Sequence, residues 1–179
     1  MGVDFMYNIS LDDKGIKFKD LEKKIYNYAC DEACKMMKQV LESLDERLLK
    51  ERDSTVYRNK GLKQTCLRTI MGNVEYSRRI YQFKLEDGKK ATKFLLDEYL
   101  EMDTIGNVSI NLVETILTNI SEVSYKKTSE NIQTLCNQII SAQGVWNVVQ
   151  TVGEKIKEIE ARKIELNEIN FLCALLIFM

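Results

Sequence analysis

The chain has 179 residues, of which 45% are hydrophobic, and its formal net charge at pH 7 is −1. These values predict a soluble globular protein of one or two domains. Histidine is absent. Its absence removes the usual general base for nucleophilic catalysis and leaves a zinc site only thiolates and carboxylates as ligands.

Charge is distributed unevenly along the chain. Residues 1–46 hold seven basic and ten acidic side chains, whereas residues 48–90 hold eleven basic and five acidic ones. The average over the whole chain therefore conceals a basic middle segment. A basic face is the electrostatic footprint expected of a nucleic-acid-binding protein.

The five cysteines are odd in number, and only Cys30 and Cys34 are closely spaced. This pattern predicts neither a disulfide framework nor a zinc cluster, but small buried thiols in a reduced compartment. The N-terminus lacks the basic flank and apolar run of a signal peptide. We therefore expect a cytoplasmic protein.

The first predicted element is a long helix from about Phe18 to Leu49, within an N-terminal segment 1–49. Its apolar residues recur at helical spacing and cover a wide face, which predicts a helix packed on two sides. One face holds Leu21, Ile25, Tyr28, Ala29, Met36, Val40 and Leu44, and it is widened by Cys30, Cys34, Met37, Leu41 and Leu48.

The second segment, 50–105, contains a predicted β-meander from about Val56 to Phe94. Val74, Tyr76 and Ile80 alternate with Ser77, Arg79 and Tyr81, and turns are predicted at residues 71–73 and 87–88. Basic residues are interleaved with Tyr57, Tyr76 and Tyr81; they are Arg58, Lys60, Lys63, Arg68, Arg78 and Arg79.

Two interpretations of this basic meander remain open. A twisted ribbon carrying arginines can lie along DNA phosphates or enter a groove. Alternatively, lysine and arginine on exposed strands prevent edge-to-edge pairing whatever the function. The acidic residues that follow, Asp97, Glu98, Glu101 and Asp103, are interpreted as a solvated helix end and not as a metal site, because two-metal sites draw carboxylates from separate elements.

The third segment, 106–167, is predicted to be helical, with one helix at Ile110–Val123 followed by a helix-turn-helix over Ser121–Ile156, whose second helix is prolonged to about Leu166. Ser141 is the predicted N-cap of that second helix. A tight polar turn is expected between the two helices.

The second helix of this motif has two contrasting faces. Val145, Val148, Val149, Val152, Ile156 and Ile159 form one stripe, and Gln143, Asn147, Gln150 and Glu154 lie opposite. Asn and Gln can pair in bidentate fashion with adenine. Gln143, Asn147, Gln150 and Ser141 are therefore candidate DNA contacts, together with the basic pair Lys126 and Lys127. The alternative is two ordinary packed helices with a solvated polar face.

Several of these pieces, in this order, resemble the N-terminal half of bacterial insertion-sequence transposases of the ISLre type, long catalogued as an uncharacterised protein family. The most specific are T-I-M-G-N-V-E-Y-S-R-R at 69–79, L-L-D-E-Y-L at 95–100 and S-A-Q-G-V-W-N-V-V-Q at 141–150. The resemblance covers about residues 21–167. It implies a DNA-binding region that precedes a ribonuclease-H-like domain, in which three carboxylates bind two Mg²⁺ ions for strand cleavage and transfer.

The resemblance ends near Asn167, where an apolar tail, 168–179, follows. We expect that the catalytic domain and its Mg²⁺ site are missing from this chain, that the tail is a frameshift product and not a membrane anchor, and that the chain alone is inactive in strand transfer. The tail is about half the length needed to cross a bilayer.

The sequence as a whole predicts an α+β, mainly α-helical fragment of a transposase that binds double-stranded DNA at terminal inverted repeats and holds no cofactor of its own. A self-associating helical protein that forms a homodimer, a stand-alone DNA-binding regulator, and a subunit that works with a separately encoded catalytic chain remain as alternatives.

Overall fold

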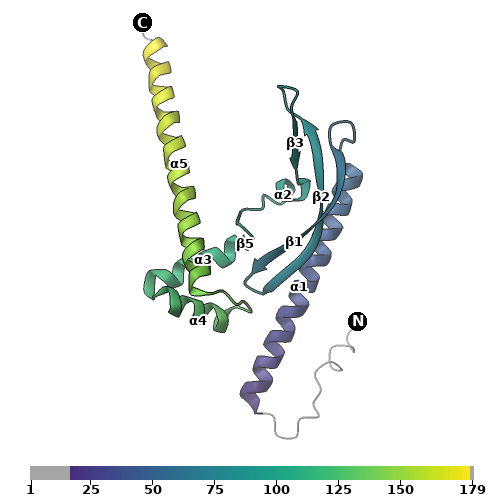
Figure 1. The fold of residues 1–179 in the computed structure, drawn as a ribbon, viewed down its shortest axis with the longest axis vertical. Helices are drawn as coiled ribbons and strands as arrows, with labels where there is room; N and C mark the ends of the chain where they lie inside the picture. The colour runs from purple at the N-terminus through teal and green to yellow at the C-terminus, as the bar shows by residue number, and fades with distance from the viewer. Residues whose placement is uncertain (1–16, 178–179) are drawn as a thin grey trace. The chain divides into compact units, whose positions relative to one another are not determined.

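The computed structural model describes the backbone of residues 17–177 and the side chains of residues 17–163. The fold is α+β and mainly helical, as predicted (Figure 1). The chain forms two compact units. The first comprises residues up to Asp103 together with Cys136–Gln138, and the second comprises Thr104–Leu135 and the chain from Ile139 onward.

The first unit begins with helix α1, Phe18–Glu51, which confirms the predicted long helix. Proline is absent from the chain and α1 contains no glycine, so nothing in its 34 residues interrupts the helical hydrogen bonding. The helix ends where the Arg52 N–H donates to the carbonyl of Leu48 and the backbone becomes extended.

Three antiparallel strands follow in the spatial order β3–β2–β1: β1 at Arg58–Thr69, β2 at Gly72–Lys84 and β3 at Lys90–Lys93. This arrangement confirms the predicted meander. The first turn lies at Ile70–Met71, slightly earlier than predicted. Gly72 opens β2 with φ +141°, and a Cβ there would lie 3.1 Å from the Cys34 Sγ. The position therefore favours glycine on two grounds.

The core of the first unit lies between α1 and the β1–β2 hairpin (Figure 1). Its buried members are Leu41, Leu67, Val74, Tyr76 and Leu96, the last from the short helix α2, Leu95–Tyr99. Cys34, Leu44, Leu48 and Met102 pack around them. Val74 and Tyr76 of the predicted period-two pattern thus meet one face of α1, as the sequence predicts, whereas Ile80 is only half-buried.

Carboxylates of α1 accept hydrogen bonds from the backbone of β2. The Ser77 N–H donates to Glu42 Oε1 at 3.0 Å, and the Arg79 N–H donates to Asp45 Oδ1 at 3.0 Å. β3 pairs with β2 only from Tyr81 onward. The helix therefore provides acceptors for strand N–H groups that β3 does not reach.

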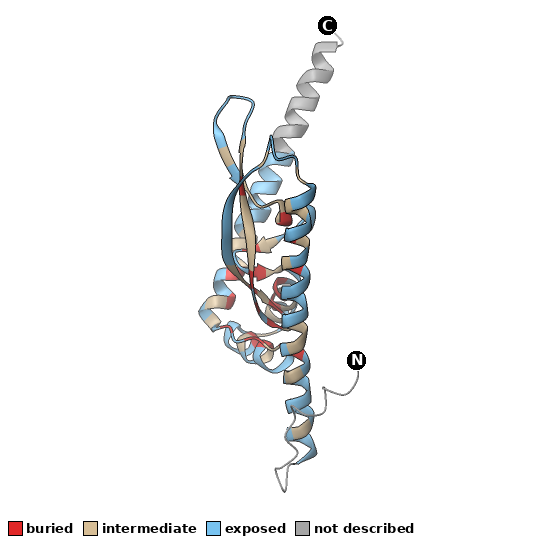
Figure 2. Ribbon diagram, turned by 90° about the vertical axis from the view of Figure 1, so that its right-hand side faces the viewer, coloured by how far each residue is buried: buried red, intermediate tan, exposed pale blue. Residues whose placement is uncertain are grey.

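Only one of the two predicted sides of α1 is covered in the described chain. Cys30, Leu41 and Asp45 are buried, whereas Met36 and Val40 are 65% and 54% exposed. Figure 2 shows exposed residues along much of this helix. The expectation that Met36 belongs to the core was wrong. The reason is geometric, because the sheet covers the side that carries Leu41 and leaves the adjacent stripe open.

The second unit contains the short strands β4, Thr104–Ile105, and β5, Val108–Ser109, which pair in a hairpin. Helices α3, Ile110–Glu122, α4, Tyr125–Leu135, and α5, Ala142–Ile177, follow and pack together (Figure 1). Their shared core includes Leu112, Ile116, Thr128, Ile132 and Val145, each less than 2% exposed. The Asn131 amide donates to Asn119 Oδ1 at 2.9 Å and ties α4 to α3.

Helix α5 extends further than predicted, to Ile177, and side chains beyond residue 163 lie outside the described residues. The predicted apolar tail, 168–179, falls in that part. Among the described residues, no helix combines the length and apolar character needed to cross a membrane.

Candidate nucleic-acid interface

The first turns of α5 present three amides on one exposed face. Gln143, Asn147 and Gln150 are all exposed, and the Gln143 Nε2 donates to Asn147 Oδ1 at 3.0 Å. On the opposite side Val145 is 0% and Val148 6% exposed. The valine stripe is therefore buried over the first turns, as predicted, but Ile156 and Ile159, further along, are about half exposed.

Ser141 caps α5 at its N-terminus, as predicted. Its hydroxyl accepts from the Gly144 N–H at 3.1 Å, and its carbonyl accepts the first helical bond, from the Val145 N–H, at 2.9 Å. A Cβ at Gly144 would lie only 2.8 Å from Ile140 Cγ1, so the first turn packs closely on the residue before the cap. These contacts fix the direction of the helix start.

Replacing Ser141 with alanine is expected to lower the free energy of unfolding by about 1 kcal/mol, because the Gly144 N–H loses its acceptor. Thermal unfolding followed by the fluorescence of Trp146, the single tryptophan, measures the change. Ser141→Asp is the matched control, since aspartate caps as well as serine. A loss of similar size in both variants would contradict the capping role.

The connection between α4 and α5 differs from the predicted tight polar turn. It runs over residues 136–141, and Cys136, Gln138 and Ile140 are buried. Cys136–Gln138 belong to the first unit, where the Asn137 N–H donates to the carbonyl of Ile70 and the Gln138 Nε2 donates to Asn73 Oδ1. The polar composition of this connection predicted an exposed turn. Polar side chains can be buried where they have hydrogen-bond partners, as the Gln138 amide does here.

Lys126 and Lys127 lie in the first turn of α4 and are exposed. The Lys127 ammonium lies 3.2 Å from Glu130 on the same helix. Such an exposed pair is weak and can be exchanged for a phosphate contact. Both lysines are thus accessible, and Ser124 accepts the Lys127 N–H at the start of their helix.

Strand β1 carries four basic side chains and no acidic one: Arg58, Lys60, Lys63 and Arg68. The first three are exposed and Arg68 is half-buried. The pairing with β2 shifts between Asn59 and Leu62, where Gly61 has φ +110°. A bulge at this point raises the local twist of a ribbon and redirects its side chains.

Arg78 and Arg79 have carboxylate partners inside the first unit. Arg78 pairs with Asp97 and stacks over the Phe94 ring, with 4.0 Å to the centroid. Arg79 pairs with Asp45 at 2.7 Å and Glu46 at 2.6 Å. Burial acts to lower the pKa of Arg79, but these hydrogen bonds outweigh it and raise the pKa. Both arginine side chains are about 15% exposed, so they present little charge to a ligand.

The tyrosines predicted to accompany the basic residues lie mostly in the core. Tyr76 and Tyr81 are 3% and 0% exposed, and the Arg52 guanidinium lies 5.5 Å from the centroid of the Tyr81 ring. Tyr81 is therefore buried although the predicted alternation grouped it with Ser77 and Arg79, opposite Val74 and Tyr76. Tyr57 is half-buried and packs against Phe83 and Lys93. These rings pack inside the first unit and do not form an exposed stacking surface.

The acidic stretch at 97–103 is only partly the solvated helix end that was predicted. Asp97 is half-buried and pairs with Arg78, and Glu98 pairs with Lys93 at 2.7 Å. Burial raises the pKa of Asp97 even though Arg78 acts to lower it. Within the described residues, His, Cys, Asp and Glu side chains form no group of three that could hold a metal ion.

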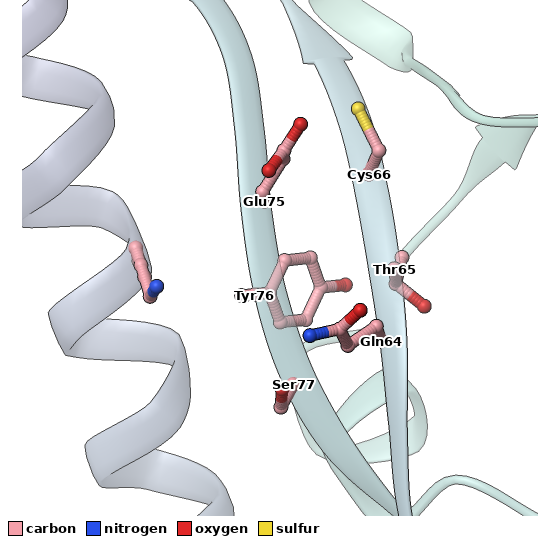
Figure 3. Close-up of a pocket in the computed structure, with 7 residues that line it drawn as sticks. Gln64, Thr65, Cys66, Glu75, Tyr76 and Ser77 are labelled. Atoms are coloured by element: carbon pink, nitrogen blue, oxygen red, sulfur yellow. The ribbon is translucent and has the colours of Figure 1, made fainter.

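A surface hollow of about 360 Å³ lies on the β1–β2 hairpin beside α1 (Figure 3). It is lined by Lys38, Gln64, Thr65, Cys66, Glu75, Tyr76 and Ser77. Cys66 and Glu75 are direct partners in the strand register. The hollow holds one lysine and one glutamate and none of the predicted site residues, so its charge favours neither phosphate nor a cation.

The model of the Uncharacterised protein family (UPF0236) matches residues 11–172. The chain belongs to this family. No curated protein and no solved structure matches the chain. The match spans both compact units, so the basic strand β1 and the amide face of α5 are features of this UPF0236 chain within the matched region.

Sequence reasoning missed one residue of the α5 surface in this UPF0236 chain. Trp146 is 43% exposed, three residues after Gln143 and four before Gln150. At about 100° per residue it lies beside the amides and not on the valine stripe. The signal was available in that spacing, which places Trp146 on the same side of the helix as the amides. A flat amphipathic ring beside amides suits a surface that contacts a partner.

Proposed function

We propose that this chain is a DNA-binding module of a transposase of the ISLre type, in which the start of α5 reads base edges and strand β1 holds phosphates. The resemblance of residues 69–79, 95–100 and 141–150 to such transposases supports the transposase assignment. The module recognises double-stranded DNA at the inverted repeats that end the element.

The observation that carries the DNA-binding part is the amide face of α5. A capped helix start with exposed Gln143, Asn147 and Gln150 over a buried valine face has the form of a recognition helix, whose N-terminal residues reach bases in the major groove. In the free protein Gln143 and Asn147 bond to each other at 3.0 Å. Each amide can exchange that bond for a bidentate contact with adenine.

Basic groups supply affinity for DNA without sequence preference, because they contact phosphates. In the second unit Lys126 and Lys127 are exposed at the start of α4. In the first unit Arg58, Lys60 and Lys63 are exposed on a strand without acidic residues. Arg78 and Arg79 have no part in this proposal, because their charges are neutralised by Asp97, Asp45 and Glu46.

Changing Gln143 and Asn147 together to alanine is expected to weaken binding to the cognate element end by about 1–3 kcal/mol per lost bidentate contact. Binding to a scrambled duplex should change little, and the fold should stay intact because both amides are exposed. Fluorescence anisotropy with the two duplexes at one fixed salt concentration measures both affinities. The inverted repeats flanking the gene supply the cognate duplex.

One control variant and two alternative outcomes make this experiment decisive. Thr134→Ala changes an exposed residue of α4 whose hydroxyl bonds only the Glu130 carbonyl, and it should leave both affinities unchanged. Equal loss on both duplexes in the double variant would reassign the amides to phosphate contacts. No loss on either duplex would leave α4 and α5 as two packed helices with a solvated face.

A further inference from the structure

Helix α1 carries a second apolar stripe that the sheet leaves uncovered. It is defined by Ile25, Ala29, Ala33, Met36 and Val40, which recur at steps of three or four residues and so share one side of the helix. We call it the outer stripe. Ile25, Met36 and Val40 are 41%, 65% and 54% exposed, and Figure 2 shows exposed residues along this helix. Contiguous exposed apolar side chains on a helix mark an interaction surface.

We propose that the outer stripe is the contact of a homodimer in which α1 of a second copy lies antiparallel to it. This proposal is independent of DNA binding, since it uses none of the residues assigned to DNA. Its basis is that the stripe is complementary to itself in one antiparallel register, in which Ala33 of one copy faces Met36 of the other.

Side-chain sizes match in this register. With Ala33 opposite Met36, Ala29 lies opposite Val40, and Ile25 lies opposite Leu44. The exposed side chains of Met36 and Val40 thus each meet an alanine, which is how facing helices interdigitate, and Ile25 meets the half-buried Leu44. By two-fold symmetry every such contact occurs twice.

Charges match in the same register. Glu22 and Arg47 flank the outer stripe on its own side of the helix. Glu22 precedes Ile25 by about one turn, and Arg47 follows Val40 by about two turns. With Ala33 opposite Met36, Glu22 of one copy lies opposite Arg47 of the other, and this pair occurs twice in the dimer. Arg47 also lies 3.7 Å from Glu51 on its own helix, and such an exposed pair can be exchanged for the contact with Glu22. A parallel pairing would instead place Glu22 against Glu22 and Arg47 against Arg47.

Shape gives a third argument. A shallow hollow of about 380 Å³ lies on this side of α1 and is lined by Gln39, Val40, Ser43, Leu44 and Arg47. In the antiparallel register the residues facing it are Ile25, Ala29 and Glu22 of the second copy. Ile25 would fill the hollow between Val40 and Leu44. The segment of α1 from Glu22 to Arg47, which contains the outer stripe, is about 38 Å long, enough for a continuous interface.

Sedimentation equilibrium of the full chain, from about 1 to 100 µM, tests the proposal. The wild-type protein should be a dimer at the upper concentrations. Met36→Glu places a charge in the middle of the stripe and should raise the dissociation constant at least about 100-fold. Glu22→Arg makes both end pairs repulsive and should raise it about tenfold.

The decisive variant is the charge exchange Glu22→Arg with Arg47→Glu, which restores opposite charges only if these two residues face each other. Its dissociation constant should return to within about threefold of the wild type. Arg47 also bonds the Tyr99 hydroxyl at 2.7 Å, so far-UV circular dichroism and urea unfolding verify that each variant is folded. Asp20→Arg, the same charge change two residues away and off the stripe, is the matched control and should dimerise normally.

A wild-type chain that stays monomeric at 100 µM would overturn the proposal. So would a double variant no tighter than Glu22→Arg alone, which would indicate a parallel or different register. A third outcome would also contradict the dimer: a monomeric wild type whose unfolding midpoint is lowered by Met36→Glu. In that case the outer stripe would be covered by residues of the same chain that precede residue 17.

Discussion

Asp45→Ala is expected to lower the free energy of unfolding of the first unit by about 3–5 kcal/mol. The Asp45 side chain is 1% exposed and accepts two hydrogen bonds from Arg79, one from its backbone N–H at 3.0 Å and one from Nη1 at 2.7 Å. Its removal leaves a largely buried guanidinium with one carboxylate fewer and leaves a strand N–H without its acceptor. Urea unfolding followed by circular dichroism measures the loss.

Glu46→Ala is the matched control, because Glu46 pairs with the same arginine from a position that is 49% exposed. A pair with one exposed partner contributes little, and the expected loss is below about 1 kcal/mol. Losses of equal size for Asp45 and Glu46 would show that burial of the carboxylate does not decide the effect. The distinction matters for function, since it separates structural arginines from those free to meet phosphate.

DNA affinity is expected to fall by roughly 150-fold between 50 and 200 mM salt if Arg58, Lys60, Lys63 and Arg68 each neutralise one phosphate. Each neutralised phosphate contributes about 0.9 to the slope of log affinity against log salt, so four contribute about 3.6. Anisotropy titrations of a random duplex at several salt concentrations give this slope. A slope near zero would remove strand β1 from the DNA contact.

Arg58→Ala with Lys60→Ala is expected to reduce the magnitude of the slope by about 1.8, because two phosphate contacts are lost. Lys19→Ala with Lys23→Ala removes the same net charge from exposed positions of α1 and should leave the slope near its wild-type value. If both double variants reduced the slope equally, net charge and not the position of β1 would govern binding.

Local periodicity predicted most of the elements. The long α1, the three-stranded meander and the capped start of α5 at Ser141 each depend on spacing within a short window, and each is present. Helix and strand patterns of this kind reflect the 3.6-residue and two-residue repeats of the backbone. The exposure of Gln143, Asn147 and Gln150 was predictable for the same reason.

Pairing between distant residues could not be predicted. Arg78 and Arg79 appear in sequence as free basic groups next to a turn, but their partners Asp97 and Asp45 lie 19 and 34 residues away. The same limit applies to Tyr81, whose buried ring has the Arg52 guanidinium over it, and to Gln138, whose amide bonds Asn73. The sequence shows that a charged or amide side chain is present. Only the tertiary fold shows whether that charge is neutralised or that amide is hydrogen-bonded within the protein.

The two strand N–H groups that donate to Glu42 and Asp45 bear on how this chain avoids aggregation. A β-strand with open N–H and C=O groups is a template on which another chain can add a strand. Helix α1 precedes β2 in the sequence, so during synthesis it leaves the ribosome first and is present when the strand emerges. Detachment of α1 would reopen this part of the strand. While it is packed on β2, helix α1 thus keeps this part of the strand from pairing with a strand of another chain.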